Sequence, residues 1–148
     1  MPTDRSFQAE NARERERLKT LLERLSDADL GRSLGHGWTV ADTLVHLAFW
    51  DLRAVTLIDR FEKNGVSPSP IDIHPVNDAI QALGRSIPRR AAARLTIDAA
   101  ETVDRRIEAM PDRLIDAVAA AGSPFSLERH VHRAEHRDEI ECTLRGSA

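Results

Sequence analysis

The stretch "GWTVADTLVHLAFWD" (residues 37–51) predicts the opening of an amphipathic helix with a histidine among its apolar residues. Thr39 is a favourable N-cap, and Asp42, three residues later, completes an approximate capping box. Apolar side chains then recur at helical spacing, so this helix is expected to end near residue 63. His46 lies at the edge of the apolar side of the helix, where it is either a packed core residue or a ligand.

The rest of the chain shows the same helical periodicity, and no alternating run is long enough to predict a strand or a sheet. The other predicted helices cover residues 7–25, 76–83, 88–110, 112–121 and 127–144, the last two marked by Gly122 as a C-cap and Ser126 as an N-cap. A linker rich in proline and turn residues, "NGVSPSPIDIHP", follows the second long helix. The sequence therefore predicts an all-α four-helix bundle with a long crossover between helices 2 and 3.

Composition limits the classes of protein to which the chain can belong. Its 148 residues are 41% hydrophobic and 30% charged, which predicts a single domain over residues 1–148. No run approaches the roughly 18 apolar residues that a membrane span requires, and the polar N-terminus does not resemble a signal peptide. The single cysteine, Cys142, fits a reducing compartment, so we expect a cytoplasmic protein. A net charge of −3 argues against a nucleic-acid partner.

Two of the six histidines, His132 and His136, are four residues apart in the last predicted helix. This spacing places them about 40° apart around the helix axis and one turn apart along it, so both imidazoles can reach one metal ion. The same arithmetic turns His130 roughly 200° away from His132. Arg133 and Arg137 lie toward the other side and are expected to form a solvated face. An H-x-x-x-H pair also arises easily by chance, so the pair alone does not establish a site.

If the second and last long helices lie side by side, His46 completes a three-histidine site with an open fourth position. Such a site suits catalytic zinc, or nickel, iron or manganese, better than a closed structural site does. Cys142 is turned about 120° away from His136, so a small buried hydrophobe is the better interpretation than a nucleophile or a fourth ligand.

Four further side chains near His46 are given structural roles. Asp51 falls on the apolar side of its helix and needs a partner, either a backbone amide of the 31–38 loop or an arginine. Asp42 is interpreted as a cap, with the ring N–H of His46 as an alternative partner. Trp38 and Trp50 are expected to be core residues, with Trp50 as a wall of the site.

Together with "HRAEHRDEIE" (residues 132–141), the opening stretch resembles the DinB-like superfamily, which includes thiol-dependent S-transferases and the N-terminal domain of mycothiol-dependent maleylpyruvate isomerase. The segment 77–107 is similar to the third helical segment of that family. The resemblance implies a four-helix bundle that binds a divalent metal through His46, His132 and His136. It also implies a homodimer, with which the alanine-rich third segment agrees.

Two functions of different classes follow from this resemblance. In the first, a low-molecular-weight thiol binds the open metal position as a thiolate and attacks an electrophilic carbon of a small-molecule substrate, as in a transferase or isomerase. Hydrolysis by a metal-bound hydroxide is a variant of this enzyme. In the second, the protein is a non-catalytic, stress-associated module that binds a metal or ligand. His36 in a glycine-flanked loop and His74 in the linker are not expected to be ligands.

Overall fold

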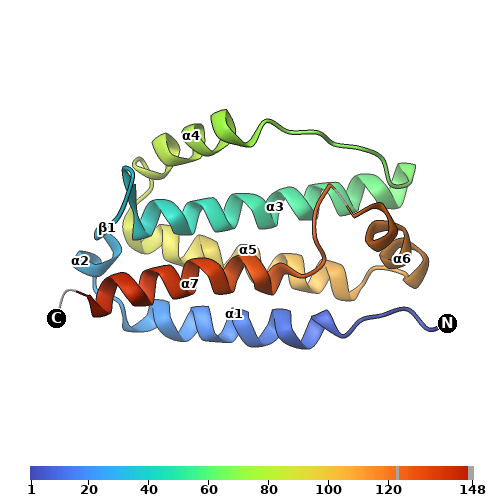
Figure 1. The fold of residues 1–148 in the computed structure, drawn as a ribbon, viewed down its shortest axis with the longest axis horizontal. Coiled ribbons are helices and arrows are strands. Elements are labelled where there is room, and N and C mark those ends of the chain that lie inside the picture. Colours follow the sequence, from blue (N-terminus) through green and yellow to red (C-terminus); the bar gives the residue numbers. More distant parts are fainter. Residues whose placement is uncertain (123, 147–148) are drawn as a thin grey trace.

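The computed structural model describes residues 1–122 and 124–146, and it is mostly helical, as the sequence predicts (Figure 1). The elements are α1 (Phe7–Arg24), α2 (Asp27–Leu30), β1 (Ser33–Gly35), β2 (Trp38–Thr39), α3 (Val40–Asn64), α4 (Ile73–Gly84), α5 (Arg89–Glu108), α6 (Asp112–Ala121) and α7 (Arg129–Arg145). The four long helices, α1, α3, α5 and α7, run alongside one another (Figure 1). Among the described residues, every helix is too short or too polar to span a lipid bilayer.

Helix α3 begins where the sequence predicts because its capping box forms. The Thr39 hydroxyl accepts a hydrogen bond from the Asp42 amide at 3.1 Å, and the Asp42 carboxylate accepts one from the Thr39 amide at 3.2 Å. On the next turns Leu44 and Leu47 are buried in one apolar cluster with Leu18 of α1. Ile140 of α7 belongs to the same cluster. This packing fixes the rotation of α3 against α1 and α7.

The crossover between α3 and α5 contains helix α4, which packs on α3 (Figure 1). This helix begins at Ile73, three residues earlier than predicted, so His74 lies on its first turn and not in a linker. At the end of α4, Gly84 is buried directly over the start of α3. A Cβ at Gly84 would lie 2.9 Å from the Asp42 carboxylate and 3.2 Å from the Asp42 Cα. The missing side chain therefore lets α4 rest against the capped end of α3.

A short antiparallel hairpin, β1 and β2, precedes α3, although the sequence predicted no sheet. Its strands have three and two residues, which is too short to show an alternating pattern. The turn between them places Gly35, His36 and Gly37 in the left-handed region, with φ of 96°, 53° and 80°. Glycine adopts this conformation without strain, which explains two of the three turn residues. The hairpin leads directly into α3 and places Trp38 beside its first turns.

Candidate metal centre

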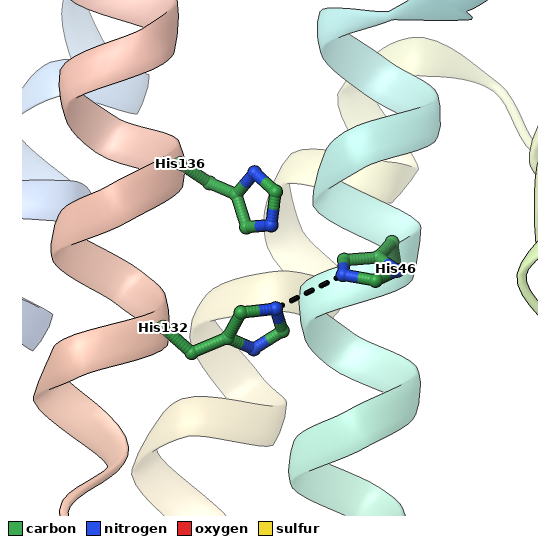
Figure 2. A group of neighbouring side chains, drawn as sticks. All are labelled: His46, His132 and His136. Carbon is green, nitrogen blue, oxygen red and sulfur yellow. Dashed lines mark hydrogen bonds between the residues drawn. The ribbon is translucent and has the colours of Figure 1, made fainter. Parts of the chain in front are cut away.

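His46 of α3 and His132 and His136 of α7 come together where these two helices face each other (Figure 2). One nitrogen of each ring lies within 4.8 Å of one nitrogen of each other ring. The three centroid-to-centroid distances are 4.9, 5.0 and 4.9 Å, so the rings form a nearly equilateral triangle. The structure thus brings together all three histidines that the sequence singles out, in an arrangement that could hold one ion.

The distance between two of these nitrogens provides a test of whether an ion fits. The Nε2 atoms of His46 and His132 are 2.9 Å apart. This is shorter than two metal–nitrogen bonds of about 2.0–2.1 Å placed end to end, so one ion can contact both atoms. Two imidazole lone pairs do not approach this closely unless a proton or a cation lies between them. The donor set therefore fits a divalent ion that prefers nitrogen ligands.

Burial keeps two of the histidines in the neutral form that binds metals. It lowers the pKa of His132 to about 3, and the neighbouring His136 and His46 lower this pKa further. Burial, followed by the effect of His136, lowers the pKa of His46 to about 4, against a smaller opposing effect of Asn77. At neutral pH these imidazoles carry no charge, so an incoming ion meets no imidazolium at these two positions.

A cavity of about 250 Å³ adjoins the three-histidine cluster. It is lined by Trp38, Thr43, His46, Asn77, His136 and Glu139. Because two of the three histidines face this cavity, a ligand inside it can reach the open side of the cluster. A larger hollow of about 480 Å³ lies far from this chemistry, near Phe61 at the other end of α3.

The remaining histidines lie away from the cluster. His130 faces α1, where its backbone amide and its Nδ1 are 2.9 and 3.0 Å from the Asn11 side-chain oxygen. This is the orientation that the helical spacing predicts. His36 lies in the hairpin turn and His74 on α4, and both are exposed.

The predicted solvated face of Arg133 and Arg137 is wrong, because α7 is surrounded by other helices on that side. The Arg133 side chain is only 1% exposed and forms ion pairs with Asp51 and Asp104. Arg137 pairs with Glu14 of α1 at 2.9 Å. Of the two partners proposed for Asp51, arginine is therefore the correct one.

Cys142 is exposed on α7, so its prediction as a small buried residue is wrong. The buried positions of α7 are Arg129, Arg133 and Ile140, and position 142 lies outside that face. Cys142 does not line the cavity beside the histidines. Cys142 therefore lies outside the site, so it is neither a ligand nor a nucleophile there.

Two tryptophans flank His46, and both pack against an apolar cluster as predicted, but Trp38 and not Trp50 lines the cavity. Trp38 is half-buried and lines the cavity, with its ring centroid 5.7 Å from that of His46 in an edge arrangement. Trp50 approaches the same imidazole from another side at 6.3 Å and donates its indole N–H to Asn77. Asp42 serves as the cap, and the buried Nδ1 of His46 has no hydrogen-bond partner, so the alternative Asp42–His46 contact is not formed.

Sequence reasoning missed two polar residues beside the cluster. Glu139 accepts a hydrogen bond from Nδ1 of His136 at 3.0 Å, and its spacing of three residues from His136 on a helix is a signal that could have revealed it. Asn77 comes from α4 in the crossover, and no spacing in the sequence relates it to His46.

The metal-free protein is expected to lose stability as the pH falls from 7 toward 4. The pKa values of His132 (about 3) and His46 (about 4) lie below 6.5, the value of an ordinary histidine. Below pH 6.5 the unfolded chain takes up protons that the folded chain does not, so the free energy of unfolding falls. Each histidine contributes at most about 1.4 kcal/mol per pH unit, and less where solvent reaches the ring. Urea denaturation at several pH values measures how the free energy of unfolding changes with pH. If His132→Ala shows the same pH dependence as wild type, the effect does not come from His132.

One of three comparisons with known proteins gave a match. Searches of curated proteins and of solved structures gave no significant match. The model of the DinB superfamily matches residues 10–143, a span that includes α3, most of α7 and the three histidines. Because this match covers most of the 148 residues, the chain belongs to the DinB superfamily.

Proposed function

We propose that this protein binds a divalent metal ion, zinc in the first place, through His46, His132 and His136, and that it is a metal-dependent transferase using a low-molecular-weight thiol. The observation that carries the proposal is the triangle of imidazoles beside a cavity of about 250 Å³. Three nitrogen ligands with an accessible fourth position are typical of catalytic zinc sites, whereas structural sites are closed by four protein ligands.

The nucleophile in this proposal comes from outside the chain. A divalent ion would lower the pKa of a coordinated thiol and so provide a thiolate at neutral pH. The described lining of the cavity contains no cysteine or lysine, and Cys142 is on the exposed side of α7. Trp38 forms an apolar part of the cavity wall, while Thr43 and Asn77 offer polar groups that can orient a small molecule.

A titration of the cobalt-loaded protein with mycothiol, bacillithiol and glutathione tests this function. We expect one of these thiols to produce an intense thiolate-to-cobalt charge-transfer band in the near ultraviolet, because sulfur would then occupy the open position. A Cys142→Ser variant should give the same band, which excludes the chain's own thiol as its source. Bound cobalt with no new band at saturating concentrations of all three thiols would refute the transferase proposal.

A non-catalytic metal-binding or ligand-binding module is the second candidate. The hydrogen bond of Glu139 favours this second candidate. Glu139 is the carboxylate among the described lining residues, and its Oε2 accepts a hydrogen bond from His136 at 3.0 Å. A carboxylate engaged in this way is less free to act as a general acid or base. The same titration separates the two candidates, because a module without thiol chemistry would bind the metal and leave its spectrum unchanged.

A further inference from the structure

His136 has a carboxylate partner on its own helix. Glu139 lies three residues further along α7, and its Oε2 is 3.0 Å from Nδ1 of His136. The imidazole side chain is 18% exposed and the carboxylate 42% exposed, so the pair lies at the edge of the site. Both residues line the cavity.

This contact determines which nitrogen of His136 can bind a metal. A neutral imidazole carries one N–H, and an ionised carboxylate only accepts hydrogen bonds, so the proton belongs on Nδ1. The lone pair is then on Nε2. Figure 2 shows the other ring nitrogen of His136 turned toward His46 and His132, where that lone pair would meet an ion.

The other ligand from α3 is held differently. Nδ1 of His46 is buried and has no hydrogen-bond partner, and its ring is fixed by edge contacts with Trp38 and Trp50. His136 has no comparable indole contact among the described ring pairs. The hydrogen bond to Glu139 is therefore the polar contact that orients His136, whereas the two indoles flank the ring of His46 and the Asn77 side chain acts on it more weakly.

We propose that Glu139 is a positioning residue that holds His136 in the Nδ1–H tautomer and thereby presents Nε2 to the ion. This inference rests on the proposed metal binding. It gives a role to Glu139, which is not one of the three proposed ligands. Loss of such a partner typically weakens metal binding by about 10–100-fold. Glu139→Ala should show a loss of this size, whereas Glu139→Gln should restore most of the affinity, because its amide oxygen can still accept the Nδ1–H bond.

A simple effect of negative charge is the main competing explanation, and Glu135 provides the matched control. Glu135 is exposed on α7, next to His136 in sequence, and does not line the cavity. Glu135→Ala removes the same charge from the same helix without removing the contact to His136. It should therefore leave metal affinity within about twofold of wild type, as expected for a screened surface charge.

The experiment measures Zn²⁺ affinity by competition with a chromophoric chelator, and the ring tautomers of the metal-free proteins by ¹⁵N NMR. We expect His136 to be mainly Nδ1–H in wild type and in Glu139→Gln, and to shift toward a tautomer mixture in Glu139→Ala. Equal affinities for wild type and Glu139→Ala, equal losses for Glu135→Ala and Glu139→Ala, or an unchanged tautomer would each overturn the proposal. If wild type binds no metal, the proposed function fails, and the NMR result still decides whether Glu139 sets the tautomer.

Discussion

Alanine at His46, His132 or His136 should leave the purified protein without stoichiometric metal. The nearest nitrogens of His46 and His132 are 2.9 Å apart, and all three rings contribute a nitrogen within 4.8 Å of the others. Removing one ring from such a site leaves two imidazoles, which hold a divalent ion poorly. Elemental analysis of the purified variants measures the metal content directly.

The three histidines outside the cluster supply the controls. His130→Ala is the most demanding of them, because His130 is two residues from His132 and lies on the same helix. It contacts Asn11 instead of the cluster, so this variant should keep its metal. His36→Ala and His74→Ala change exposed residues and should also bind metal as wild type does. Loss of metal from His130→Ala together with retention in His132→Ala would show that the assignment of the ligands is wrong.

The ligand variants should remain folded, because none of the three histidines belongs to the apolar clusters of the core. Their melting temperatures should fall relative to metal-loaded wild type. A ligand present at about 1,000 times its dissociation constant stabilises the folded state by about 4 kcal/mol, and this contribution disappears with the site. Chelation of wild-type protein should produce the same decrease, while the ligand variants should not respond to a chelator.

The three clustered histidines could be predicted from the sequence because helix capping and helical spacing determine the direction of their side chains. The capping box of Thr39 and Asp42 sets the start of α3 and so the face on which His46 lies. The four-residue spacing of His132 and His136 depends only on helix geometry. That α3 and α7 meet was an assumption of the bundle topology, and the family resemblance supported it.

The errors concern features that depend on tertiary contacts. Arginine is usually exposed, so its residue type alone places Arg133 at the surface. In the fold, two carboxylates, Asp51 of α3 and Asp104 of α5, compensate its charge. The apolar character of Cys142 predicts a buried residue, but the rotation of α7 against its neighbours leaves it exposed, and its residue type does not encode that rotation. The cavity wall formed by Asn77 depends on how the crossover folds back over α3, which local periodicity does not encode.

Asp51→Ala should destabilise the protein by about 3–5 kcal/mol, the usual cost of breaking a buried ion pair from one side. The Asp51 side chain is 5% exposed and pairs with Arg129 at 2.9 Å and with Arg133 at 3.4 Å. Arg133 also pairs with Asp104, which in turn binds Arg15 of α1 at 2.7 Å. These residues connect α1, α3, α5 and α7 through the interior.

The charge balance explains why this loss should be large. Arg15, Arg129 and Arg133 carry three positive charges, and Asp51 and Asp104 carry two negative ones. Removing Asp51 leaves one carboxylate for three guanidinium groups, of which the Arg129 and Arg133 side chains are 8% and 1% exposed. A buried cation without its partner keeps its desolvation cost and loses the compensating attraction. Asp51→Asn should recover little of the stability, because it restores the shape of the side chain but not the charge.

Asp59 is the matched control, since it lies two turns further along α3 and pairs with Arg106 at the surface. Its side chain is 55% exposed, so Asp59→Ala should cost less than about 1 kcal/mol. Urea denaturation of chelator-treated wild type, Asp51→Ala and Asp59→Ala gives the loss of unfolding free energy for each variant, without a contribution from bound metal. Equal costs at Asp51 and Asp59 would mean that the interior network adds no more than a surface pair does. In that case apolar packing alone would have to hold α7, with His132 and His136 on it, against α3.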